Sequence, residues 1–194
     1  MKRRFGALLV LTAVMLALCG CSLTLTEPKE VVNDFFKGLK TKNEDVLILY
    51  TENEDINMLL HSKGKEADLN KMYDSIFKNF SYKILSTEKN EEETQATVTA
   101  EVSNVDFSKV LKNYQKRAYN YMQDNLYSGN LSKKKLNAKC LSIFANQTEK
   151  ASESTKLQTE TITINLTKND NYSWDMQLTE EMMEIIMGGL IIPL

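Results

Sequence analysis

The thiol of Cys21 is the reactive group whose surroundings in the sequence are the most informative. It follows an apolar run from Ala7 to Leu18, which is itself preceded by Lys2-Arg3-Arg4. A basic start, an apolar core of about a dozen residues and small residues at the end are typical of a secretory signal peptide. The run is too short to span a bilayer, which takes ~20 apolar residues. The sequence therefore predicts export, with a cysteine at the end of the signal.

The residues Leu18-Cys19-Gly20-Cys21 resemble the lipobox of bacterial lipoproteins. Leu18 stands three residues before Cys21, Gly20 stands one before it, and Ser22 fits the position that follows. The resemblance implies that a diacylglyceryl group is attached to the Cys21 thiol and that residues 1–20 are removed. Two or three acyl chains hold a protein firmly at a membrane, because each buried CH₂ contributes ~0.8 kcal/mol. Plain secretion and an uncleaved anchor are the alternatives.

The chain without residues 1–20 is long enough for one domain with its own core. The full sequence has 24 Lys and Arg against 26 Asp and Glu, so loss of the three leading cations leaves 21 against 26, or about −5. We expect this charge to be spread along the chain, with Lys133-Lys134-Lys135 as the only basic run and part of a solvated helix face. Because phosphate binding needs clustered Lys and Arg, we expect no nucleic-acid partner.

The remaining cysteine and the single histidine offer little for metal or nucleophilic chemistry. Once Cys21 carries lipid, Cys140 has no partner for a disulfide within the chain. His61 is the only histidine, so we expect no zinc site, no other metal and no cofactor. Cys140 falls on an apolar helix face and is expected to be a small buried hydrophobe. A nucleophilic cysteine would need a base, and His61 is the sole candidate.

The elements that must position these side chains follow from periodicity. Apolar residues three and four apart predict helices, and strict alternation predicts antiparallel strands with one wet face. We expect three N-terminal helices, a hairpin, a pair of helices, a second hairpin and a terminal helix. The predicted helices begin near residues 28, 43, 69, 106, 132 and 180, and the predicted strands cover about 82–84, 95–102, 155–166 and 172–178.

Several local features are specific enough to be tested. Thr26 or Glu27 is expected to cap the first helix, and Asn43 or Thr41 the second; Asp106, Ser132 and Thr179 are expected to start later helices. Leu157 is out of phase with the rest of its strand, which predicts a bulge or a bend there. Tyr172 and Trp174 should share one face of the last strand. Residues 190–194 form an apolar tail that should dock on the body.

Two segments resemble small bacterial lipoproteins of the nuclear transport factor 2-like superfamily, which have a cystatin-like domain. They are residues 28–40, PKEVVNDFFKGLK, similar to the opening helix, and residues 171–176, NYSWDM, similar to the last strand. The resemblance implies an α+β fold in which a curved antiparallel sheet of about four strands packs on N-terminal helices as a cone with a pocket. Residues 106–151 depart from it as a helical insertion between the hairpins. We expect residues 21–27 to be a tether and residues 28–194 to be one domain.

The resemblance also implies where catalysis would occur, since enzymes of this superfamily place an Asp or a His inside the cone as a general base. The candidates are His61, Asp55, Tyr73 and Tyr114. His61 lies in a polar loop and Asp55 in an acidic, solvent-facing turn, so we expect no catalytic residue. The sequence predicts a lipid-anchored extracytoplasmic protein that binds a small apolar ligand, a peptide or a partner protein without catalysis. The alternative is a pocket enzyme of isomerase, dehydratase or hydrolase type.

Overall fold

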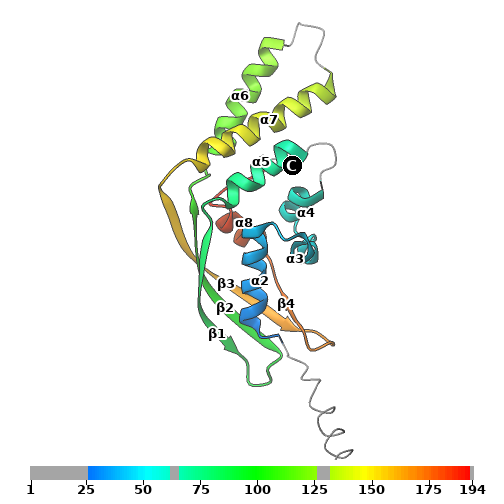
Figure 1. The fold of residues 1–194 in the computed structure, drawn as a ribbon, viewed down its shortest axis with the longest axis vertical. Coiled ribbons are helices and arrows are strands. Elements are labelled where there is room, and N and C mark those ends of the chain that lie inside the picture. Colours follow the sequence, from blue (N-terminus) through cyan, green and yellow to red (C-terminus); the bar gives the residue numbers. More distant parts are fainter. Residues whose placement is uncertain (1–25, 62–65, 126–131, 193–194) are drawn as a thin grey trace, which may run out of the picture.

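The computed structural model describes residues 26–61, 66–125 and 132–192. Within these residues, seven α-helices and a four-stranded antiparallel sheet form an open α+β fold (Figure 1). One face of the sheet is buried under helices and the other is largely solvated. The prediction of an α+β chain with about four antiparallel strands is confirmed. Cys21 and the predicted signal peptide lie outside the described residues.

Four α-helices precede the sheet, one more than the sequence predicts. Helix α2 starts at Pro28, whose missing N–H is harmless in a first turn, and the Glu27 N–H donates to Glu30 Oε2 at 3.1 Å. Asn43 accepts from the Asp45 N–H and caps the next helix, as predicted. The acidic stretch expected to be a turn contains the start of an additional helix at Glu54. The elements are α2 (Pro28–Thr41), α3 (Glu44–Leu47), the 3₁₀ turn η1 (Ile48–Tyr50), α4 (Glu54–His61) and α5 (Glu66–Phe77).

The four strands pair in chain order. They are β1 (Ser81–Lys89), β2 (Gln95–Val105), β3 (Leu157–Lys168) and β4 (Trp174–Met176). The register between β2 and β3 is continuous up to the Val105–Leu157 pair, so the irregularity predicted at Leu157 is wrong. Leu157 simply points to the solvated face, where it is 47% exposed. The register shift lies instead in β1, between Ile84 and Ser86.

The turn between β3 and β4 corrects the predicted phase of the last strand. The Asn169 side chain accepts hydrogen bonds from the N–H groups of Asn171 and Ser173, both at 3.0 Å. This turn holds Tyr172 at a φ of 61°, outside the strand and 68% exposed. Tyr172 therefore does not share the inner face with Trp174, which is buried as predicted. The alternation begins only after the turn closes.

The C-terminal segment packs against the end of β2. Helix α8 (Glu180–Ile186) is capped by Thr179, which accepts from the Met182 N–H at 3.2 Å, as predicted. Gly188 follows with a φ of +65°, and a Cβ there would lie 2.0 Å from the Val105 carbonyl oxygen. Glycine alone permits this approach. Leu190 and Ile192 are buried, which confirms the predicted docking of the tail for the described part of it.

A buried amide ties three elements together. Asn104 Nδ2 donates to the carbonyl oxygens of Ile76, at 3.0 Å, and Ile186, at 2.9 Å. Its Oδ1 accepts from the Val105 N–H at 2.8 Å. The side chain thus satisfies carbonyls near the ends of α5 and α8, which have no helical partner of their own. Asn104 fixes both helices on β2.

Residues 109–125 and 132–152, together named the helical hairpin here, project beyond the sheet at one end of the molecule (Figure 1). They contain α6 (Val110–Asn125) and α7 (Lys133–Ser152). Asp106 does not cap α6 as predicted, because it accepts from the N–H and hydroxyl of Ser108 and closes a turn before the helix starts. Ser132 caps α7 as predicted. The apolar face expected on α6 is only partly buried, and Met122 is 40% exposed.

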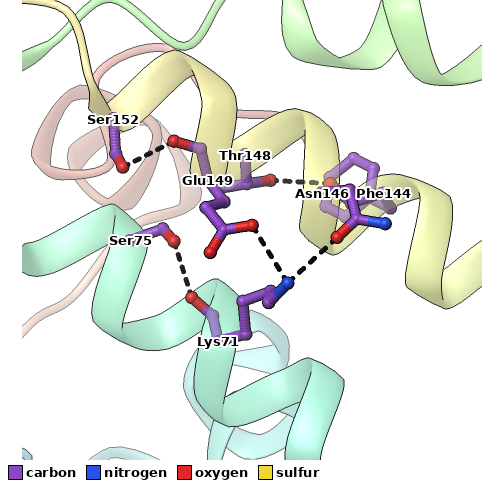
Figure 2. Close-up of polar contacts among 7 residues, drawn as sticks. All are labelled: Lys71, Ser75, Phe144, Asn146, Thr148, Glu149 and Ser152. Atoms are coloured by element: carbon purple, nitrogen blue, oxygen red, sulfur yellow. Dashed lines mark hydrogen bonds and ion pairs between the residues drawn. The ribbon is translucent and has the colours of Figure 1, made fainter.

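The base of the helical hairpin is held on α5 by polar contacts (Figure 2). Lys71 Nζ contacts Glu149 Oε2 and Asn146 Oδ1 of α7, both at 3.0 Å. Between the two helices lie small hydroxyl side chains whose donors return to their own helix carbonyls. They are Ser75 of α5 and Thr148 and Ser152 of α7, and all three are buried. Small residues let the two helices approach closely at this point.

Candidate functional site

A groove runs between the first turns of α4 and α8. It consists of two adjoining hollows of about 400 and 210 Å³, which share Asn53, Glu54 and Glu180. We call it the acidic groove because five carboxylates line it. They are Glu52, Glu54, Asp55, Glu180 and Glu184.

Local capping explains why acids gather here. The Asn53 side chain accepts from the Ile56 N–H at 3.2 Å and starts α4, as Thr179 starts α8. Acidic side chains are favoured in a first helical turn, where the helix dipole is positive. Both helices point such a turn at the groove. Two separate helix starts, remote in sequence, therefore meet as one negative surface.

Asp55 is the sequence candidate that the structure places in this groove. It belongs to the first turn of α4 and is half-buried, so its assignment to a solvent-facing turn is wrong. Burial raises the pKa of the Asp55 carboxyl, and the charges of Glu180 and Glu54 raise it further. The carboxyl is therefore easier to protonate than an ordinary surface aspartate.

Apolar side chains form the rest of the groove. Leu49 and Ile191 are 74% and 53% exposed at its margins, while Met176 and Leu178 are half-buried within it. Tyr50 packs edge-on against a buried phenylalanine, Phe35, with ring centroids 4.8 Å apart. Burial raises the pKa of the Tyr50 hydroxyl, with smaller contributions from Asp175 and Asp34. The groove therefore combines apolar contact area with negative charge.

This arrangement is suited to binding. Among the described residues, its lining contains no histidine, cysteine or lysine that could act with a carboxylate as a nucleophile or base pair. Within the described ranges, no group of three or more His, Cys, Asp or Glu is placed to hold a metal ion. Carboxylates beside exposed apolar groups attract a ligand that carries both a cation and an apolar part.

The other sequence candidates are not brought together. His61 is the last residue of α4 instead of a loop residue, and its side chain is outside the described part. The buried Tyr73 hydroxyl donates to the Leu39 carbonyl oxygen, and burial raises its pKa. Tyr114 packs edge-on against a phenylalanine of the helical hairpin, and burial and the Cys140 thiol raise the pKa of its hydroxyl. Cys140 is half-buried, which corrects the expectation of full burial.

A second feature is missed by the sequence prediction. Nine Lys and Arg against two Asp and Glu lie in residues 109–152, a charge of +7, whereas the rest of residues 21–194 has 12 against 24, a charge of −12. The expectation that charge is spread along the chain is therefore wrong. The concentration of cations is already present in the sequence, but neutral residues interrupt it and no single run shows it. With the cations concentrated in one segment, the charge distribution no longer speaks against a phosphate-bearing ligand.

Comparisons with known proteins give little beyond this geometry. No family model matches the chain, and no curated protein is significantly similar to it. One similar solved structure is that of ycdA from Bacillus subtilis subsp. subtilis strain 168, provisionally described as a lipoprotein. It shares 17% identity and a TM-score of 0.42 over 87% of this chain and 48% of that one. This chain thus spans about half the length of that protein.

In the described part of the chain, no helix is both long and apolar enough to cross a bilayer.

Proposed function

We propose that the protein is a bacterial lipoprotein of the cell envelope, held on the extracytoplasmic side of a membrane by lipid on Cys21. The lipobox residues support this proposal, as does the position of Pro28, where the domain's first helix starts only seven residues after Cys21. The resemblance of residues 28–40 and 171–176 supports a nuclear transport factor 2-like ancestry for the domain. The body would then be suspended close to the membrane surface.

The anchor is tested by intact-mass analysis of the protein from the membrane fraction. The expected mass is that of residues 21–194 plus at least two acyl chains on the first residue. A Cys21→Ser variant should lose both the added mass and firm membrane attachment, while Cys140→Ser should keep them. A chain that starts at Cys21 without lipid mass, or a Cys21→Ser variant that is equally well attached, would overturn the anchor.

We propose that the domain is a binding module and that the acidic groove takes a peptide segment with a cation next to apolar side chains. The observation that carries this proposal is that half-buried Asp55 and exposed Ile191 line one hollow of the acidic groove, and exposed Leu49 lines the hollow that adjoins it. Apolar contact would supply affinity, and the carboxylates would select for Lys or Arg.

The binding test uses a short alternating Lys/Leu peptide as the probe and a Lys/Ser peptide of equal charge as its control. The combined variant Leu49→Ser/Glu180→Gln removes one apolar and one acidic group from the groove. Its matched control, Leu157→Ser/Glu91→Gln, changes an exposed leucine and an exposed acid elsewhere. We expect at least a tenfold loss of affinity for the groove variant and none for the control. Equal loss in both variants, or equal binding of both peptides, would contradict the groove as the site.

A pocket enzyme is the second candidate, because the raised pKa of Asp55 suits a general acid. The Asp55→Asn variant separates the two functions once a cellular phenotype is known. A binding module keeps most of its function in this variant, since four other carboxylates remain in the groove. An enzyme that uses Asp55 for proton transfer would lose catalytic activity by a factor of ~10²–10⁴.

A further inference from the structure

The cations of the helical hairpin are exposed to solvent. None of them forms an ion pair with another described residue. Of the two acids in the helical hairpin, Glu149 is paired with Lys71 of α5, so only Asp124 is available to offset the positive charge. The nine exposed cations are Lys109, Lys112, Lys116, Arg117, Lys133, Lys134, Lys135, Lys139 and Lys150.

The spacing of these residues concentrates the field. Lys112 and Lys116 on α6 lie four residues apart, as do Lys135 and Lys139 on α7, and such pairs share a helix face. Like charges at this spacing destabilise a helix by a few tenths of a kcal/mol per pair. The Lys139 ammonium also lies 5.7 Å from the centroid of the Tyr121 ring. The two like-charge pairs therefore cost helix stability and favour an external anion, whereas the ring contact joins Lys139 of α7 to α6.

The chemistry of the cations favours a flexible polymer over a protein. Eight of the nine are lysines. Lysine is a strongly hydrated point charge on a flexible stem, whereas arginine makes fixed bidentate contacts. Lysine is also depleted in protein–protein interfaces, where arginine and aromatic residues are enriched. A chain of regularly spaced phosphates needs only such mobile point charges.

The position of the helical hairpin argues against the bilayer as its partner. The hairpin and the start of α2 at Pro28 lie at opposite ends of the molecule (Figure 1). With the anchor on Cys21, a step that rests on the proposed function, the membrane lies at the end away from the hairpin. The net charge of −12 on the rest of the mature chain would also repel a polyanion and direct it to the hairpin.

We propose that the helical hairpin binds a phosphodiester polymer of the cell envelope that lies beyond the membrane surface. Contact is electrostatic and independent of polymer sequence. Each phosphate that is neutralised releases condensed counterions, so affinity falls steeply with salt. The protein then joins the membrane, through Cys21, to a layer further out.

The test measures binding of the whole protein, purified in a non-ionic detergent, to poly(glycerol phosphate) between 50 and 200 mM salt. The variant Lys133→Gln/Lys134→Gln/Lys135→Gln removes three adjacent charges at the exposed start of α7. The matched control, Lys29→Gln/Lys37→Gln/Lys40→Gln, removes three exposed lysines of α2. Thermal unfolding shows whether both variants remain folded. Poly-glutamate of equal charge and detergent micelles containing phosphatidylglycerol replace the polymer in two further arms.

We expect the hairpin variant to bind about tenfold more weakly or worse, and its log–log salt slope to be shallower by about 2, at ~0.7 per phosphate contact. The control should bind no more weakly than the unchanged protein. Equal affinities of the two variants would overturn the hairpin as the site. Equal binding of poly-glutamate would favour an acidic protein partner, and stronger binding of the micelles would favour lipid; either result overturns the proposal. The micelle arm uses the Cys21→Ser variant, so that no acyl chain inserts into the micelles, and none of these results then depends on whether Cys21 is lipidated or the acidic groove is occupied.

Discussion

The Tyr73 hydroxyl donates a 2.6 Å hydrogen bond to the main-chain carbonyl oxygen of Leu39. Both residues are buried, and the bond joins α5 to the last turn of α2. The Tyr73 ring also packs on Phe77. The Lys42 ammonium lies 5.0 Å from the centroid of the Tyr73 ring. The hydroxyl therefore connects two helices, and the general-base role that the superfamily resemblance leaves open does not fit it.

The Tyr73→Phe substitution should lower the free energy of unfolding by about 1–3 kcal/mol, because it leaves a buried carbonyl without a donor. Urea denaturation measures the change. Tyr119→Phe, at a 58% exposed position, is the control and should cost less than about 0.5 kcal/mol. Equal stability of the two variants would mean that the Tyr73 bond contributes nothing in solution.

Substitution of Trp174 tests the phase of the last strand. Trp174 is 6% exposed, so Trp174→Ala should cost about 3–5 kcal/mol, as is usual for large aromatic side chains in a core. Tyr172→Ala, two residues earlier in the turn, should cost less than about 0.5 kcal/mol. Denaturant unfolding measures the loss of unfolding free energy in both variants. If Tyr172 shared the inner face with Trp174, as the periodicity predicts, the two losses would be similar.

Asn104→Ala should be among the most damaging polar substitutions in the chain. It leaves the carbonyls of Ile76 and Ile186 without donors, at about 1–3 kcal/mol for each buried unpaired group. Asn57→Ala, on the exposed side of α4, is the control and should be nearly neutral. A two-state thermal transition gives both values, and a loss below about 1 kcal/mol for Asn104→Ala would show that water replaces the amide.

The raised pKa of Asp55 predicts a pH-dependent stability with a definite sign. The folded state favours the protonated carboxyl, so this contribution is complete below the ordinary value of 3.8 and is lost as the pH rises through the raised value. At pH 7, Asp55→Asn should therefore have a higher Tm than the unchanged protein, and the difference should vanish at low pH.

Asp106→Asn provides the opposite control for that measurement. Hydrogen bonds from the Ser108 side chain and backbone hold the pKa of Asp106 below its usual value. Its charged form is favoured in the folded state, so Asp106→Asn should lower the Tm at pH 7 and not raise it. Shifts of the same sign in both variants would contradict the assigned environments.

Local sequence rules predict the parts of the fold that depend on neighbouring residues. Asn43, Ser132 and Thr179 are recognised as helix caps because a cap oxygen and the backbone N–H that donates to it lie within three residues. Alternation along β2 is equally local. The predicted face of Tyr172 is wrong because a turn held by Asn169 interrupts the alternation. The spacing of apolar residues does not show where that turn ends.

The acidic groove could not be found in this way. Glu54 and Glu180 are 126 positions apart, and each alone looks like an ordinary acidic first turn. Their meeting depends on how α4 and α8 pack on the sheet. The positive charge of the helical hairpin, in contrast, can be predicted from the sequence, because a count over residues 109–152 shows it directly. Neutral residues interrupt the cations, so unbroken basic runs do not reveal it.

One cross-strand pair has a consequence for how the chain is assembled. Val105 and Leu157 face each other at the end of β2 and β3, and the intervening residues 106–156 leave and re-enter the sheet at this single point. The inserted segment therefore starts and ends at neighbouring positions, and the pairing of β2 with β3 does not depend on its length. A segment joined in this manner can be lengthened, shortened or exchanged between homologues while the scaffold beneath keeps its pairing.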